Sequence, residues 1–340
     1  MAAYFLRRFL LLIPTFLGLT VLVFAITRFV PGGPVEQMLA RAQGGAGEGR
    51  GSSALSRSSQ SLDESQIEEL RVFYGLDKPV LESYGLWLGK TLQFDFGTST
   101  RYQEPVRDLI LDRLPVTLSY GAITLCLLYC IAIPLGVFKA VRHGSLADAG
   151  SSVFLFVLQS VPSFVIGLLL LVVLSVKLDF FPMSGFASDN FAEMSISEKF
   201  RDLLWHGFLP LLSYVVGLLA FLTFLMKNAL LENLSADFVR TAVAKGAPFG
   251  HSVRRHAFRN SLVSLTPYVG SSVGILVGGS FLVETIFTID GLGLLGYDAL
   301  IQRDYPTVMG ILVVTATMVL AGNLFSDFLL AVVDPRVKFQ

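Results

Sequence analysis

The sequence predicts an all-α integral membrane protein with six transmembrane helices, for reasons of composition and of run length. Hydrophobic residues make up 53% of the 340 residues, charged residues only 15%, and the mean hydropathy is +0.64. Soluble globular domains carry about 25% charged residues, so these proportions indicate a chain that lies in lipid. The apolar residues also gather in runs close to the roughly 20 residues that a helix needs to cross a bilayer.

Six apolar runs are the predicted spans, at 9–27, 115–138, 151–176, 207–226, 262–289 and 308–333. The first run is longer than the apolar part of a secretory signal, and it ends in Pro31-Gly32-Gly33-Pro34 instead of a cleavage site. We therefore expect it to be a retained first span. Pro14 inside this run is tolerated in a membrane helix when neighbouring groups satisfy the freed backbone.

The polar segments divide the chain into three parts. These are the N-terminus with the first span (1–29), an extracytoplasmic loop (30–114), and a five-helix core (115–340) that contains a polar segment at 227–261. Within the loop, 44–61 is rich in Gly and Ser without apolar periodicity, so we expect it to be disordered. From Asp63 onward, apolar residues recur at helical spacing and predict short helices over the membrane surface.

The basic residues predict the orientation of the chain. With a cytoplasmic N-terminus, the segments on that side carry twelve Lys and Arg residues, whereas the short loops on the other side carry four. Cytoplasmic loops are enriched in Lys and Arg, and long loops count little. Both termini and the polar segment 227–261 are therefore expected in the cytoplasm, in a multi-pass protein.

Composition also excludes several classes of site. The formal net charge is zero, and the one basic segment lies too close to membrane spans to be a nucleic-acid module. The only cysteines, Cys126 and Cys130, lie four apart in an apolar run with no further Cys or His nearby. We expect them to be small buried hydrophobic residues, with no disulfide and no metal site.

No catalytic constellation is present. Residues 291–296 match G-x-G-x-x-G, but they follow a membrane span, whereas a dinucleotide site needs this pattern between a strand and a helix. The chain has no G-x-x-x-x-G-K-[ST] motif, and its four His lie at or beyond the ends of spans. We therefore expect no catalytic residue and no cofactor, so that neither a membrane-bound enzyme nor ATP hydrolysis by this chain is supported.

Several residues in the last two spans are candidates for packing or transport. Gly270, Gly274 and Gly278 recur every four residues, and such small residues let a second helix approach closely in lipid. Glu284 and Asn323 are candidates for the transport pathway or its gating, because polar groups inside a membrane are costly and often functional. Asp327, four residues after Asn323, is a weaker candidate because it can reach the membrane interface.

The polar segment 227–261 carries two acidic side chains and six cationic ones. The cationic residues are Lys227, Arg240, Lys245, Arg254, Arg255 and Arg259. A helix-forming stretch from Arg240 is stopped by Gly246 and Pro248, and a second helical stretch covers 251–261. Helix, tight turn and helix predict a rigid elbow at the membrane surface. A basic loop held by anionic lipid is the alternative, but it would not need this turn.

The run from Asp237 to Asn260 resembles the cytoplasmic EAA-type loop of ABC importer permeases, in the R-T-A-x-A-K-G and R-H-A-x-R-N form of the dipeptide/oligopeptide class. Arg240-Thr241-Ala242 stands where the broader pattern has Glu-Ala-Ala, and Arg259 replaces a Pro. Further matching motifs occur at 74–79, 94–99, 113–115, 278–280 with Glu284, 291–293, 303–306 and 334–336. Residues 31–35 and 291–297 resemble the Yej-type subgroup, which imports oligopeptides and microcin C.

The resemblance implies a type I importer permease in the bacterial inner membrane, with the loop 30–114 in the periplasm. The residues that it implies for coupling to an ATPase are Arg240, Thr241, Ala242, Ala244, Lys245, Gly246, Ala247, Arg254, His256, Arg259 and Asn260. One or two partner ATPase subunits would bind ATP and Mg and grip the elbow. A second, related permease would complete the pathway, and a periplasmic binding protein would deliver the peptide.

A self-sufficient secondary transporter or channel for small solutes is the alternative function. It predicts inverted repeats and several facing charges within the membrane, and the sequence displays neither. The chain has no phosphate-binding motif, which favours the importer, because a permease of that kind takes its energy from a separate ATPase.

Overall fold

A computed structural model describes residues 2–29, 78–277 and 281–333. The regular elements among these residues are all helices, with no β-strand, so the all-α fold class is confirmed. The disorder predicted for 44–61 and the packing role of Gly278 lie outside the described residues. The chain forms two compact units, one of Met1–Phe9, Leu114–Leu294 and Met318–Gln340, and a smaller one of Leu10–Arg113 and Leu295–Thr317.

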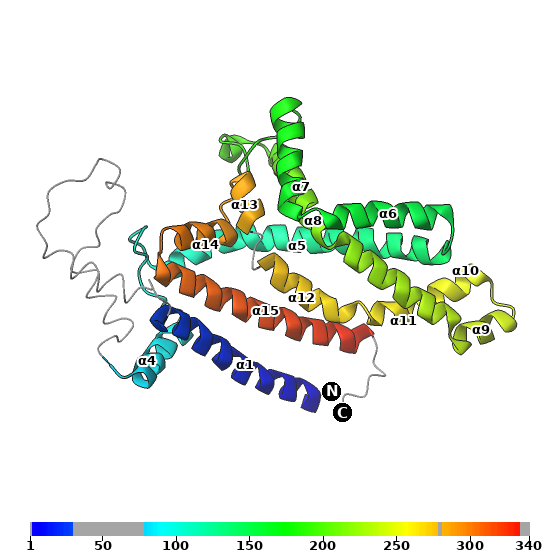
Figure 1. Cartoon of the computed structure of the whole chain (residues 1–340), viewed down its shortest axis with the longest axis horizontal. Coiled ribbons are helices and arrows are strands. Elements are labelled where there is room, and N and C mark those ends of the chain that lie inside the picture. Colours follow the sequence, from blue (N-terminus) through cyan, green and yellow to red (C-terminus); the bar gives the residue numbers. More distant parts are fainter. Residues whose placement is uncertain (1, 30–77, 278–280, 334–340) are drawn as a thin grey trace, which may run out of the picture. The chain divides into compact units, whose positions relative to one another are not determined.

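The α-helices are labelled in Figure 1. They are α1 (Ala2–Phe29), α4 (Val80–Leu92), α5 (Val106–Val141), α6 (Leu146–Ser160), α7 (Ser163–Leu170), α8 (Ile196–Ser235), α9 (Asp237–Ala244), α10 (Phe249–Ser252), α11 (Phe258–Val263), α12 (Thr266–Val277), α13 (Phe281–Phe287), α14 (Leu292–Ile301) and α15 (Tyr305–Val333). Two π-helical stretches, η2 (Leu171–Lys177) and η4 (Val253–Ala257), continue α7 and α10, and η3 (Phe191–Glu193) is a single 3₁₀ turn.

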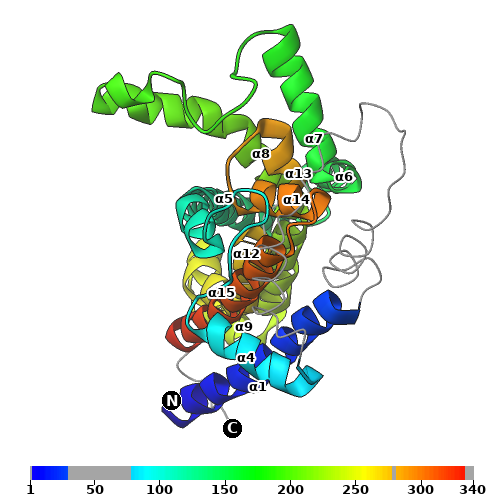
Figure 2. The same ribbon diagram turned by 90° about the vertical axis from the view of Figure 1, so that its left-hand side faces the viewer.

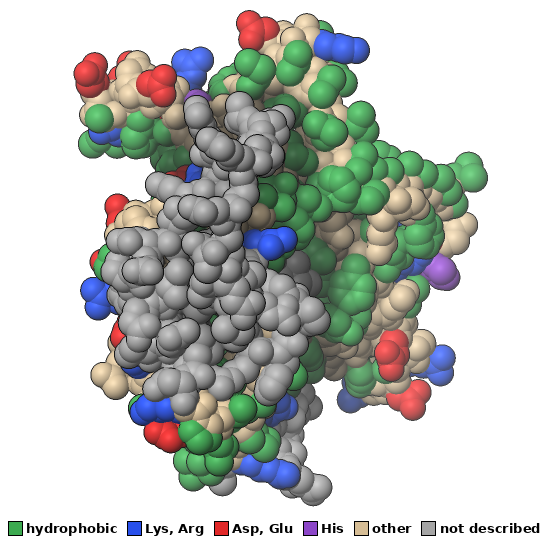
Figure 3. Space-filling model, turned by 60° about the vertical axis from the view of Figure 1, so that its left-hand side comes forward, with side chains coloured by type: hydrophobic (Ala, Val, Ile, Leu, Met, Phe, Trp, Pro, Cys, Tyr) green, Lys and Arg blue, Asp and Glu red, His purple; other side chains and the backbone are tan. Residues whose placement is uncertain are grey.

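Four helices in the described ranges are long and apolar enough to cross a membrane, in agreement with predicted spans one, two, four and six. They are Leu6–Ile26, Val106–Val141, Ile196–Ser235 and Tyr305–Val332. The predicted fifth span is divided among α11, α12 and α13, and residues 278–280 within it are not described. Figure 3 shows hydrophobic side chains over much of the described surface, as expected where a protein contacts lipid.

The predicted third span, 151–176, is not one continuous helix. The α6 helix and the α7–η2 segment meet at an angle of 92°. Pro162 at this break has no backbone N–H, and it forces the preceding Val161 into an extended conformation (φ −99°, ψ 126°). As a result, α7 leads away from α6 and the first part of α8 returns toward the rest of the unit (Figures 1 and 2).

The segment between η2 and α8 is held by its own contacts. Phe181 stacks on Trp205 and Phe208, with ring centroids 4.5 and 5.0 Å away. Ser188 donates from its backbone N–H and its hydroxyl to the carboxylate of Asp202, at 2.9 and 2.5 Å. The loop is therefore fixed to the first turns of α8.

Close helix packing in the larger unit involves Gly270. A Cβ at Gly270 of α12 would lie 2.6 Å from the carbonyl oxygen of Gly322 on α15 and 2.8 Å from the Cα of Asn323. The Ser326 hydroxyl also donates to the carbonyl of Thr266. Only a residue without a side chain fits at position 270 against the α15 backbone. Gly274 lies on the same helix, one turn further along.

The two cysteines correct one expectation. Cys126 and Cys130 are exposed on α5 and form no disulfide, whereas the sequence interpretation placed them in the protein interior. Apolar side chains at a lipid-facing surface and in a core obey the same hydropathy pattern, because lipid tails are as apolar as a protein interior. Hydropathy therefore could not distinguish the two positions.

In the smaller unit, α4 packs on α1 through aromatic side chains. The Phe24 ring lies 5.5 Å from Tyr84 and 5.7 Å from Trp87, and the hydroxyls of Thr20 and Tyr84 are 2.9 Å apart. Trp87 is only 2% exposed. Of the short helices predicted from Asp63 onward, α4 is one, while 63–77 lie outside the described residues.

Asp304 joins two motifs of the smaller unit. Its buried carboxylate accepts the Ser99 hydroxyl at 2.5 Å, the Thr100 N–H at 3.0 Å, the Thr100 hydroxyl at 3.1 Å and the Thr307 hydroxyl at 2.7 Å. The 94–99 motif and the 303–306 motif, linked by Ser99 and Asp304 across 205 residues, therefore meet at one carboxylate. A buried charge of this kind is tolerated because several donors satisfy it.

We predict that Asp304→Ala destabilises the protein by about 3 kcal/mol, because it leaves two buried hydroxyls and the partly buried N–H and hydroxyl of Thr100 without their acceptor. Thermal unfolding of the purified protein in detergent measures the loss. Glu104→Gln, at an exposed position of the same loop, is the control and should unfold like the parent. Equal unfolding temperatures for both variants would contradict the structural role of Asp304.

Candidate functional site

The polar segment 227–261 begins inside a helix. Residues 227–235 continue α8 without a break, and the elbow starts only at Ala236. Lys227, predicted to be a loop cation, is 8% exposed and its Nζ lies 2.7 Å from the Asp148 carboxylate. That prediction is wrong because residues 227–235 contain no Gly or Pro, so nothing in the chain stops the helix there.

The turn of the elbow depends on Gly246. After α9, Gly246 has φ +90°, a conformation that costs residues with a Cβ about 1–2 kcal/mol. Its N–H donates to the carbonyl of Val243, and the N–H of Ala247 donates to that of Ala242, at 2.9 and 3.1 Å. These two bonds form a Schellman motif that closes the helix end. Pro248 then prevents the helix from continuing and begins α10.

One face of the elbow is anchored to the helices behind it. Val239 of α9 and Ala257 of η4 are buried in a cluster with Met226, Leu230 and Leu265. The Ser261 hydroxyl contacts the carbonyl of Ala229, and the Asn233 amide donates to Ser261, at 3.1 and 3.2 Å. The elbow is therefore fixed to α8 and cannot move independently of it.

The other face of the elbow is open to solvent and carries most residues that the sequence predicted for coupling. The exposed ones are Arg240, Thr241, Ala244, Lys245, Gly246, Arg254, Arg259 and Asn260, whereas Ala242, Ala247 and His256 are half-buried. Three large apolar side chains that were not predicted also lie there, namely Phe238, Val243 and Phe249 at 42%, 44% and 56% exposure. Cations interspersed with apolar side chains suit a protein partner that presents acidic and apolar groups.

Glu284 belongs to α13 and lies apart from the elbow, with its carboxylate at the start of α14. Its carboxylate is 3% exposed and accepts the N–H of Leu294 at 2.9 Å, with the Tyr214 hydroxyl 3.5 Å away. The hydroxyl of Thr117 accepts the N–H of Leu292 at 2.8 Å. Together, Glu284 and Thr117 cap the positive N-terminal end of α14.

The G-x-G-x-x-G pattern makes room for this carboxylate. A Cβ at Gly291 would lie 2.5 Å from Oε2 of Glu284 and 2.8 Å from Oγ1 of Thr117, and a Cβ at Gly293 would lie 2.9 Å from Oε2. The first two glycines are therefore required by the buried acid. This is consistent with the interpretation that the motif is no dinucleotide site.

The remaining predicted residues have surroundings of their own. Asn323 is exposed on α15 and its backbone lies against Gly270. Asp327, one turn further along, pairs with Arg8 at 3.2 Å. The structure therefore gives Asp327 a cationic partner, and its role in transport stays a prediction.

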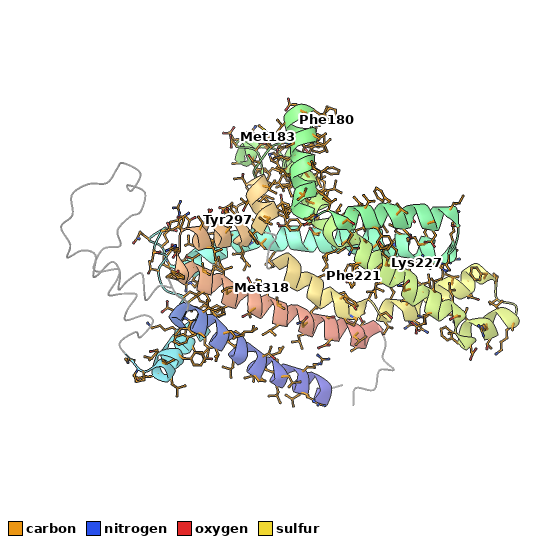
Figure 4. All side chains as sticks on the ribbon, viewed as in Figure 1. Phe180, Met183, Phe221, Lys227, Tyr297 and Met318 are labelled. Carbon is orange, nitrogen blue, oxygen red and sulfur yellow. The ribbon has the colours of Figure 1, made fainter. Side chains whose placement is uncertain are left out.

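A buried ionic cluster was missed by sequence reasoning. Asp148 of α6 lies 2.7 Å from Lys227 of α8 and 3.1 Å from Lys139 of α5, and Lys139 is fully buried. Figure 4 shows Lys227 where α8 passes α6. Both lysines were counted among the twelve Lys and Arg residues of the predicted cytoplasmic segments. The sequence signal that could have indicated the cluster is Asp148, an acidic residue close to the end of the apolar run that Lys139 follows.

With the fold and these sites in place, comparison with known proteins becomes informative. The family model described as "Binding-protein-dependent transport system inner membrane component" matches residues 132–339, a range that includes the elbow, Glu284 and Asn323. The chain belongs to this family. It is therefore a multi-pass inner membrane protein of a transport system that depends on a binding protein.

Similar proteins support the same assignment along the whole chain. The chain is 38% identical over 360 residues to the peptidoglycan transport system permease protein YejB of Agrobacterium fabrum, covering 100% of this chain and 99% of that one. It is 38% identical over 340 residues to the oligopeptide transport system permease protein AppB of Bacillus subtilis, and 34% over 356 residues to the dipeptide transport system permease protein DppB of Escherichia coli K12, with full coverage of each chain. The resemblance to ABC importer permeases, with Yej-type proteins among the relatives, is confirmed.

A solved structure shows the same fold. The MetNI methionine ABC transporter in an inward-facing conformation matches 66% of this chain and 96% of that chain, with a TM-score of 0.51 and 19% identity. Because the identity is low, this likeness concerns the fold only. It confirms the predicted fold of a type I importer permease.

We predict that Gly293→Ala destabilises the protein by about 1–3 kcal/mol, because its Cβ would overlap the buried Glu284 carboxylate. Thermal unfolding in detergent measures the effect. Gly296→Ala is the matched control in the same motif, since the nearest atom to its Cβ would be 3.7 Å away, an ordinary contact. If the two variants have the same unfolding temperature, the Glu284 carboxylate does not require a glycine at position 293.

Proposed function

We propose that this chain is the permease subunit of an ATP-driven importer of peptides, and that it forms half of the translocation pathway. The names of its full-length relatives concern peptidoglycan, oligopeptide and dipeptide transport. The shared chemical class among these cargoes is the peptide. The similarity to Yej-type relatives favours oligopeptides or a peptide conjugate such as microcin C.

The elbow is the observation on which the proposed mechanism rests. It has a fixed turn at Gly246, one face anchored to α8, and one exposed face with cations and aromatic side chains. In the mechanism, one or two cytoplasmic ATPase subunits hold this exposed face and bind ATP and Mg. Their closure on ATP would pull α8 through the anchored face and change the access of the pathway.

The remaining partners follow from the same proposal. A second, related permease completes the pathway as a heterodimer, and lipid covers the apolar outer surface. A periplasmic binding protein delivers the peptide and docks on the outer loop, in which Asp304 holds Ser99 and Thr100 in place. Both termini lie in the cytoplasm. Glu284 and Asn323 stay candidates for the pathway or its gating, with Glu284 acting through the start of α14.

Reconstitution tests the proposed function. The chain would be placed in proteoliposomes with its second permease, with or without the ATPase subunits, and uptake of a labelled oligopeptide from its binding protein would be followed. We expect uptake only when the ATPases are present and ATP is supplied on the cytoplasmic side of the membrane. Uptake by the permeases alone, driven by an ion gradient, would instead establish the alternative of a secondary transporter.

We predict that Gly246→Pro or Gly246→Trp lowers peptide uptake by about tenfold or more in this system, while the chain still inserts in the membrane. Proline cannot adopt a positive φ, and tryptophan would strain the turn and cover the docking surface. Gly250→Ala is the control, because Gly250 is helical and a Cβ there meets nothing within 4 Å. Unchanged uptake by both Gly246 variants would contradict the coupling role of the elbow.

A further inference from the structure

The buried cluster around Asp148 connects three helices of the larger unit. Lys227 of α8 donates to both carboxylate oxygens of Asp148, at 2.7 and 2.8 Å. Lys139 of α5 lies 3.1 Å from one of these oxygens. Two ammonium groups therefore share one carboxylate in a region with almost no solvent contact. The carboxylate also receives the Gly144 N–H at 3.2 Å, and His143 Nδ1 lies 3.3 Å from it.

The two lysines depend on Asp148 to different degrees. Lys139 donates to the Asp148 carbonyl oxygen and to the hydroxyls of Ser151 and Ser152, at 2.9, 2.8 and 2.7 Å. It thus has three acceptors besides the carboxylate. Among the residues that the structure describes, Lys227 donates only to this carboxylate. Lys227 is therefore the lysine for which the Asp148 charge is indispensable.

The two lysines also differ in what they hold together. Lys139 and Asp148 lie on helices that the short turn 142–145 already joins covalently. Lys227 and Asp148 are 79 residues apart, and their bond ties α6 to α8. Lys227 lies nine residues before Ala236, where the elbow begins, which is about 13 Å along a helix at 1.5 Å per residue.

The α6 helix leads onward to the part of the unit that lies away from the elbow. It ends at the 92° bend, beyond which α7 and η2 follow. Figure 4 shows Phe180 and Met183 at the far end of this segment, well away from Lys227. A displacement of α8 that is passed to α6 would therefore reach this bent segment.

We propose that the Asp148–Lys227 ion pair passes the movement of the elbow from α8 to the α5–α6 hairpin, so that both are positioning residues for ATP-driven transport. This inference rests on the proposed function. An ion pair suits the task because its two hydrogen bonds have a fixed direction, whereas apolar helix contacts can be exchanged for contacts with lipid. Pulling α8 then moves the hairpin with it.

Two matched substitutions test the proposal. Lys227→Met and Lys139→Met each remove one ammonium group and leave one ammonium opposite the Asp148 carboxylate, so the charge of the cluster changes equally. Only Lys227→Met breaks the tie between α6 and α8. In the reconstituted complex, peptide uptake and ATP hydrolysis would be measured together. We expect uptake per ATP to fall by about tenfold with Lys227→Met and to stay within about twofold with Lys139→Met.

Two further measurements separate positioning from folding. The unfolding temperature of Lys227→Met should stay at or above that of the parent, because the remaining pair is neutral in sum, and Lys227→Arg should restore uptake per ATP. Equal losses with both Met variants, no loss with Lys227→Met, or failure of that variant to assemble would each overturn the proposal. A parent complex without ATP-dependent uptake would overturn the proposed function itself, which is a distinct result.

Discussion

The polar groups of this chain have to be satisfied within the protein, because lipid offers them no partner. Two helix starts in the larger unit, those of α6 and α14, are accordingly matched by side chains. Ser145 accepts the N–H of Asp148 at the start of α6, and Thr117 and Glu284 accept the first N–H groups of α14. In the smaller unit, Asp304 accepts the N–H of Thr100, which lies in a turn, and the hydroxyl of Thr307. Gly291 and Gly293 leave space for the Glu284 carboxylate, whereas Asp148 is matched by two lysines and Asp304 by hydroxyl groups.

The same constraint separates the two faces of the elbow. Val239, Ala257 and Ser261 satisfy the inner face with apolar packing and hydrogen bonds to α8, whereas Arg240, Lys245 and Arg254 remain in water on the outer face. A loop that only bound anionic lipid would have no use for the strained turn at Gly246. A fixed shape with mixed charge and apolar groups is instead typical of a surface that a protein partner recognises.

The sequence allowed prediction of the features that depend on local pattern. Apolar run length predicted most spans, and Gly246 followed by Pro248 predicted the turn of the elbow. The 92° bend was less visible, because Pro162 inside an apolar run can either kink a membrane helix or break it, and only the packing of α7 on α8 decides between them. The pairing of Lys227 with Asp148 and of Glu284 with α14 depends on contacts across 79 and 10 residues. The residue types indicate that these charged groups are costly to bury in lipid, but they do not identify the groups with which they pair.

Polar ties determine which helices move together in a membrane protein of this kind. When two helices slide, an apolar side chain exchanges one apolar neighbour for another or for a lipid tail, at little cost in free energy. Separating the Lys227 ammonium from the Asp148 carboxylate costs about 3–5 kcal/mol, because that ammonium would stay buried without a compensating charge. Asp148 joins α6 to α8, Ser326 joins α15 to Thr266 at the start of α12, and Glu284 joins α13 to α14. A force applied at the elbow should therefore displace α6 and α8 as one body, and rearrangement should take place at the purely apolar contacts between such bodies.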